Sequence, residues 1–217
     1  KALLAELRSR LATVDGEAAG RAPALLYAAS ALGGATVRTP ERLQGIADRE
    51  KLAFLADDVR SKPVGFWTGS DTLRAIFRQD RMLQTPLEPG KDVEAVARAL
   101  KEDARARSAY EGYLFLTEQL GGPFVSKDLR WYLAALDKGE EPRGAGTFAF
   151  LPACRSVESD LVRRLWGDSG MPEDADLLGE LVRRVRAGEI ALDPEAATSW
   201  YGRVRASLAP LLDLSKT

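Results

Sequence analysis

Residues 193–211 read DPEAATSWYGRVRASLAPL, and this stretch shows most clearly how the chain is built. It begins with Asp193, Pro194 and Glu195, which are typical of a helix N-cap, a first-turn proline and a first-turn acid. Apolar side chains then recur at the spacing of one helix face, at Ala197, Trp200, Tyr201, Val204, Leu208 and Leu211. The stretch therefore predicts an amphipathic helix, which Pro210 kinks or ends near its last turn.

The same helical spacing of apolar residues recurs along most of the chain. No segment shows the strict apolar and polar alternation of a half-buried strand. Further start signals stand before helical patterns: Ser70, Ser126 and Ser156 are N-cap candidates, and Asp174 or Pro172 begins a later pattern. The sequence therefore predicts an all-α fold, an irregular multi-helix domain of about nine helices.

A helix is expected to begin at Thr39-Pro40-Glu41 and to close before Pro63. We expect its apolar residues Leu43, Leu52, Leu55 and Val59 to face the interior. Another helical run spans residues 91–120, with a bend expected near Ser108 or Gly112. The apolar segment 147–152 is too short to assign and suits either buried coil or an edge strand.

Residues 139–146 are rich in glycine, proline and charge, which indicates an exposed loop. We expect this loop to divide an N-terminal helical bundle, residues 1–138, from a C-terminal helical part, residues 147–217, packed on it as one compact unit. The chain begins at Lys1 rather than at a methionine. We interpret it as a processed or shortened protein, or as one portion of a larger one, and its cellular location stays open.

Composition narrows the possible functions. The 31 basic and 32 acidic side chains are spread evenly, which disfavours nucleic acid as a partner, and the absence of a long apolar run predicts no membrane span. The chain has no histidine, which excludes Ser-His-Asp and Cys-His catalysis and histidine-ligated metals and haem. With Cys154 as the single cysteine, no metal or other cofactor is expected.

The most unusual segment is the loop at residues 63–71, PVGFWTGSD, where Phe66 and Trp67 stand before a helix that Ser70 caps. Arg74, Arg78 and Arg81 follow at spacings that place them on one helix face. These groups suit a site for an anionic ligand. In the alternative interpretation the aromatics fill the core, and Asp71 and Asp80 neutralise the arginines.

A second loop, residues 122–128, repeats the pattern of glycine, aromatic and N-cap with Phe124 and Ser126. Trp131 follows it and lies off the apolar stripe of its helix, which suits either a contact surface or a helix edge. If the two loops meet, their aromatics would wall a cleft. The sequence alone does not show that they do.

Two hypotheses of function follow. The first is a helical interaction module that binds another protein chain, or the rest of a larger parent protein, through Phe66, Trp67, Ser70, Phe124 and Trp131, with a small anionic ligand as a further possibility. The alternative is a histidine-independent enzyme that holds an anionic substrate with the three arginines and moves a proton with Asp71 or Asp80. An enzyme requires a concave pocket, whereas a module requires an exposed apolar patch.

Overall fold

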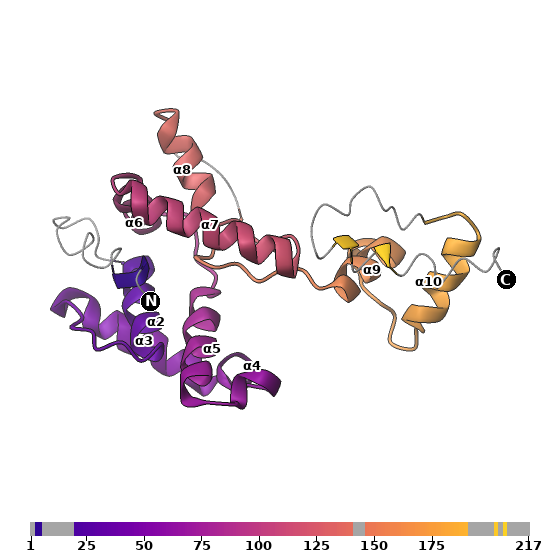
Figure 1. Ribbon diagram of the computed structural model, residues 1–217, viewed down its shortest axis with the longest axis horizontal. Helices are drawn as coiled ribbons and strands as arrows, with labels where there is room; N and C mark the ends of the chain where they lie inside the picture. Colours follow the sequence, from indigo (N-terminus) through magenta and orange to yellow (C-terminus); the bar gives the residue numbers. More distant parts are fainter. Residues whose placement is uncertain (1–2, 6–19, 141–145, 191–201, 204–205, 208–217) are drawn as a thin grey trace. The chain divides into compact units, whose positions relative to one another are not determined.

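The computed structural model describes residues 3–5, 20–140, 146–190, 202–203 and 206–207 (Figure 1). The described residues are mostly helical, with 67% helix and 3% strand, which confirms the all-α multi-helix prediction. Most of the helix expected over 193–211 lies outside the described residues, as does the segment 141–145 of the expected boundary loop. Within the described ranges, no helix is both long and apolar enough to cross a lipid bilayer.

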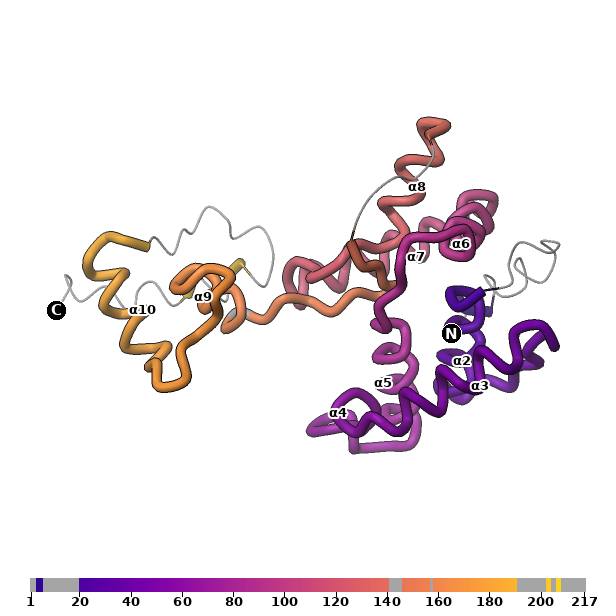
Figure 2. Tube along the Cα trace, turned by 180° about the vertical axis from the view of Figure 1, so that it is seen from behind, coloured from indigo at the N-terminus to yellow at the C-terminus, as the bar shows by residue number. Residues whose placement is uncertain are grey.

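The described helices follow one another along the chain. Their bounds are α2 (Arg21–Leu32), α3 (Glu41–Ala56), α4 (Asp58–Ser61), the 3-10 helix η1 (Gly65–Thr68), α5 (Asp71–Leu83), α6 (Lys91–Lys101), α7 (Ala104–Gly121), α8 (Leu129–Asp137), α9 (Val157–Trp166), the 3-10 helix η2 (Gly167–Ser169) and α10 (Leu177–Arg186). Figure 2 traces the same path from behind.

The chain divides into two compact units. Unit 1 comprises residues 1–112 and 126–153, and unit 2 comprises residues 113–125 and 154–217, so that α7 contributes to both. The division expected from the sequence, into 1–138 and 147–217, stays a prediction, because most of its boundary loop lies outside the described residues.

The core of unit 1 forms around α2, which packs against α3 and α5. Residues 22–30 of α2 are all buried, because most side chains on every side of this helix are small or apolar. The helix ends at Gly33, where a Cβ atom would lie 2.2 Å from the side-chain oxygen of Gln79 on α5. The end of α2 therefore approaches α5 so closely that an added side chain would require the Gln79 side chain to shift.

The inward face of α3 differs from the expected one. Leu43, Ala47 and Phe54 are buried, whereas Leu52 is 65% exposed and Leu55 is 40% exposed. At 100° per residue, Leu52 lies about 180° around the helix from Leu43, and Phe54 returns to the buried face. The expectation that Leu52, Leu55 and Val59 face the interior was wrong.

Val59 is exposed for a different reason, because α3 has ended before it. The backbone leaves the helix at Asp57, whose carboxylate accepts a hydrogen bond from the Arg60 N–H at 3.2 Å and caps α4. Val59 then lies on the new short helix, 88% exposed. The acidic pair Asp57 and Asp58 thus starts a helix.

The apolar segment 147–152 enters the core of unit 1 as buried coil with isolated β-bridges. Phe148 bridges to Leu87 and to Lys127, and its N–H donates to the Leu87 carbonyl at 2.9 Å. The buried hydroxyl of Tyr110 donates to the Phe150 carbonyl at 2.9 Å and accepts from the Leu129 N–H at 3.1 Å. This enclosure raises the pKa of Tyr110, chiefly through desolvation.

Side-chain caps fix several helix starts. Ser70 and Ser156 cap α5 and α9 as predicted. The predicted cap at Ser126 was wrong, because Asp128 caps α8 by accepting from the Arg130 N–H at 2.9 Å. Asp176 likewise begins α10, rather than Asp174 or Pro172. A carboxylate nearer to the first free N–H groups determines both of these starts.

The run over residues 91–120 is interrupted earlier than expected. α6 ends at Lys101, and the carboxylate of Asp103 accepts hydrogen bonds from the Arg105 and Ala106 N–H groups at 3.0 and 2.9 Å. The break therefore lies at residues 102–103 and not at Ser108 or Gly112, which are both inside α7.

Candidate functional site

The two aromatic side chains of the 63–71 loop have different environments. The ring of Trp67 is partly buried and lies 5.9 Å from the ring of Phe77 on α5. Phe66 packs edge-on against Trp67 at 5.6 Å and is 74% exposed. Trp67 thus anchors η1 to α5, while Phe66 presents an aromatic ring to solvent.

Phe66 is one of several large apolar side chains that the same part of unit 1 exposes. They lie between the last turns of α3 and η1, and they are Leu52, Leu55, Val59, Val64 and Phe66. We name them the α3–η1 surface. Where exposed apolar side chains gather into one patch, they mark interaction sites in many proteins.

The polar groups at the start of α5 bond to one another. The Ser70 hydroxyl accepts from the Leu73 N–H at 3.2 Å. Arg74 forms an ion pair with Asp71 at 2.7 Å and also donates to the Thr68 carbonyl. Because its charge is already compensated, Arg74 serves to hold η1 against α5, as in the second of the two interpretations of this loop.

Arg78 and Arg81 have another arrangement. Their Nε atoms donate at 3.4 Å to the carbonyls of Ser61 and Arg60 at the end of α4, which packs beside α5 (Figures 1 and 2). Arg60 itself turns back and donates to the Thr85 hydroxyl at 2.7 Å. We name Arg60, Arg78 and Arg81 the arginine cluster.

No carboxylate compensates the arginine cluster within unit 1 as described. Arg60, Arg78 and Arg81 are each partly buried, and none of the three has an ion pair with a described Asp or Glu. Asp80, expected as a neutralising group, accepts from the Gln79 amide at 3.3 Å and, within the described chain, forms no ion pair with Arg78 or Arg81. The sequence pattern found Arg78 and Arg81 but missed Arg60, because Arg60 belongs to a separate helix.

Trp131 and Phe124, the aromatic residues in and after the second loop, lie in different units. Trp131 contacts Tyr132 edge-on at 5.1 Å, and the Lys127 ammonium lies 4.3 Å over its ring. Among the described residues, no ring contact links Trp131 to Phe66 or Trp67. Phe124 belongs to unit 2, where it forms an isolated β-bridge with Cys154.

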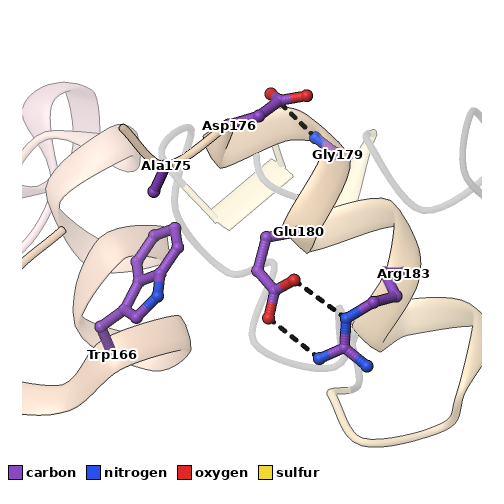
Figure 3. A pocket seen from close by; sticks show the side chains of 6 residues that line it. All are labelled: Trp166, Ala175, Asp176, Gly179, Glu180 and Arg183. Carbon is purple, nitrogen blue, oxygen red and sulfur yellow. Dashed lines mark hydrogen bonds and ion pairs between the residues drawn. The ribbon is translucent and has the colours of Figure 1, made fainter. Parts of the chain in front are cut away.

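Unit 2 contains a shallow pocket of about 470 Å³ between α9 and α10 (Figure 3). Trp166 forms one wall, and its ring packs beside a small core of Leu161, Leu165 and Leu181. The polar groups that line the pocket are already paired: Asp176 caps α10, and Glu180 forms ion pairs with Arg183 and Arg184. Hydrogen bonds from these two arginines lower the pKa of Glu180 to about 2. The pocket therefore offers a ligand no unpaired charge.

Two further kinds of site are in question, a reactive thiol and a metal site. The Cys154 thiol is partly buried, and desolvation followed by the charge of Glu118 raises its pKa. Across the described parts of the chain, no group of three or more His, Cys, Asp or Glu side chains is arranged to hold a metal ion.

A second set of exposed apolar residues lies in unit 2, on the last half of α7 and just beyond it. These residues are Tyr113, Phe115, Leu116, Leu120 and Val125. The α3–η1 surface differs from them in belonging to the same unit as Arg60, Arg78 and Arg81.

The chain was also compared with known proteins. No protein-family model matches it, and neither a curated protein nor a solved structure is similar to it.

Proposed function

We propose that this protein is a helical interaction module that binds another protein chain through the α3–η1 surface. The observation that carries the proposal is the exposure of Val59 and Phe66, at 88% and 74%, in a segment whose backbone is well held. The partner is a separate chain or the rest of a larger parent protein.

The contacts that hold η1 on α5 support this proposal. Trp67 packs on Phe77, and Arg74 bridges Asp71 and the Thr68 carbonyl. These contacts fix the backbone that carries Phe66, so that binding loses little backbone entropy. An aromatic side chain on a rigid loop is typical of the residues that dominate the affinity of protein interfaces.

The enzymatic alternative has less support from the same geometry. Its proposed acid or base, Asp71, has a side chain that is 99% exposed and ion-paired with Arg74. General acid–base catalysis needs such a group to face a substrate in a site that excludes water. Because the Asp71 side chain is surrounded by solvent, binding by the apolar surface is the better supported function.

Affinity capture from an extract of the source organism tests this proposal. Immobilised wild-type protein should retain a partner chain, and Phe66→Asp should lose it, because a charge in the centre of an apolar contact must be desolvated. The matched control is Leu178→Asp, which places the same charge at a 64% exposed leucine of unit 2.

Equal retention by wild type and Phe66→Asp would contradict the proposal. Loss of the partner by both variants would show that added charge, and not the α3–η1 surface, affects retention. Circular dichroism of all three proteins checks that each is folded.

A further inference from the structure

The arginine cluster carries an inference about the chemistry of the partner. We propose that Arg60, Arg78 and Arg81 form an anion-binding site that takes carboxylate side chains of the partner protein. This inference rests on the proposed function and adds to it a partner whose contact segment combines acidic and apolar residues.

The first argument is the number of N–H donors that the cluster leaves unused. Arg78 donates only through Nε, to the Ser61 carbonyl, and at 3.4 Å that bond is long. Arg60 donates through one terminal nitrogen, to Thr85, and its guanidinium lies 5.5 Å from the centre of the Phe54 ring. Arg81 donates twice, to the Arg60 carbonyl and to the Gln84 side chain at 2.7 Å. A guanidinium has five N–H donors in a planar fork. Among the contacts of the described residues, the Arg60 and Arg78 guanidinium groups each donate one hydrogen bond, so both keep donors for a further acceptor.

The second argument is electrostatic. The Arg78 and Arg81 guanidinium groups are directed at consecutive carbonyl groups, those of Ser61 and Arg60, which brings like charges to the same end of α4. Partial burial reduces their screening by water, and no described carboxylate lies within ion-pair distance of either group. An oxyanion bound between them would relieve this repulsion and would accept bidentate hydrogen bonds.

The third argument is position, which favours a protein carboxylate over a small free anion. Arg60 directly follows Val59, and the Ser61 carbonyl that Arg78 binds lies three residues before Val64. The arginine cluster is therefore built on the same short segment of chain that carries the exposed Val59 and Val64. A partner segment that carries glutamate or aspartate beside leucine or phenylalanine complements both features at once.

The experiment follows the arginine Nε–H resonances of the whole chain by NMR during three titrations. The probes are a synthetic helical peptide with glutamates beside leucines, the same peptide with glutamine at every glutamate, and inorganic phosphate, all at one ionic strength. We expect the glutamate peptide to shift the resonances of Arg60, Arg78 and Arg81 and the glutamine peptide to bind at least about tenfold more weakly, as for the loss of a charge-assisted hydrogen bond.

Matched variants separate the cluster from general charge. Arg78→Gln and Arg81→Gln should each weaken binding of the glutamate peptide about tenfold. Arg98→Gln should leave it unchanged, because Arg98 is exposed on α6 and already ion-paired with Glu94. Equal weakening by Arg98→Gln, or equal binding of the two peptides, would overturn the inference.

The remaining outcomes distinguish this inference from the proposed function. Loss of peptide binding in Phe66→Asp but not in the two cluster variants would keep the α3–η1 surface and overturn the anion site. Shifts caused by phosphate alone, with neither peptide bound, would show a site for a free anion and would overturn the assignment to a protein carboxylate.

Discussion

Tyr110 connects three parts of unit 1 through a single hydroxyl group. Replacing it with phenylalanine removes the hydrogen bond to the Phe150 carbonyl and leaves the buried Leu129 N–H without its acceptor. We expect Tyr110→Phe to lower the free energy of unfolding by about 2 kcal/mol, the usual effect of leaving a buried polar group unsatisfied. Urea unfolding followed by circular dichroism measures the loss.

Tyr113→Phe is the control for this measurement. Tyr113 is 43% exposed, so water can replace its hydroxyl as a hydrogen-bond partner. Its replacement should therefore change the free energy of unfolding by less than about 0.5 kcal/mol. Equal effects of the two substitutions would show that the Tyr110 hydrogen bonds contribute nothing specific.

Glu180 makes the stability of unit 2 depend on pH in the acidic range. Its pKa falls from 4.5 to about 2 because Arg183 and then Arg184 donate hydrogen bonds to the carboxylate. Below pH 4.5 the unfolded chain takes up this proton first, so the stabilisation is complete above pH 4.5 and disappears as the pH falls toward 2. NMR titration of the Glu180 carboxyl should show a midpoint near pH 2.

Substitution of the neighbouring arginines tests the cause of this shift. Arg184→Gln should raise the midpoint, because it removes a hydrogen bond of 2.6 Å to Glu180. Arg186→Gln should not, since among the described residues Arg186 forms no hydrogen bond or ion pair with Glu180. A wild-type midpoint near 4.5 would contradict the arrangement of this ion pair.

At the scale of the elements, two glycines respond in opposite directions to the same added methyl group. Gly33→Ala places a Cβ atom against the buried side chain of Gln79 and should destabilise the protein by about 1–3 kcal/mol, as overpacking does. Gly45→Ala lies inside α3 with open space around it and should stabilise by about 0.5–1 kcal/mol. Thermal unfolding of the pair checks both signs, and a stabilising Gly33→Ala would refute the close approach of α2 to α5.

Helix starts were predictable where the sequence offers a single capping residue close to the start. Ser70 and Ser156 are such cases. The start of α8 was misassigned because two capping residues, Ser126 and Asp128, compete within three positions, and only the fold decides which one meets the free N–H groups. The inward face of α3 was misassigned because Leu52 and Phe54 are both apolar, and local spacing does not decide which of them meets α2.

For the whole molecule, the contrast between a buried and an exposed apolar side chain tests whether the α3–η1 surface is open to solvent. Phe54→Ala removes a ring that is 2% exposed and should lower the free energy of unfolding by about 3–5 kcal/mol. Val59→Ser should change it by less than about 0.5 kcal/mol. Urea unfolding measures both, and a large loss in Val59→Ser would show that part of the chain covers this surface.

The candidate site was only partly predictable, because it depends on contacts between helices. Spacing along α5 placed Arg78 and Arg81 on one face, and both reach the end of α4. Spacing did not reveal Arg60, which approaches them because α4 packs on α5. The exposure of Phe66 was likewise hidden, since an aromatic between glycines suits a core position as well as a surface one.

The enclosed phenol of Tyr110 also provides an optical signal of unfolding. In alkaline solution an exposed tyrosine ionises near its ordinary pKa of about 10, and its near-ultraviolet absorption then moves to longer wavelength. The raised pKa of Tyr110 keeps this phenol protonated while unit 1 is folded, so its tyrosinate absorption appears only as the hydroxyl leaves the Phe150 carbonyl. Stopped-flow absorbance after a jump to alkaline pH would therefore record the opening of unit 1 in real time, without any attached dye.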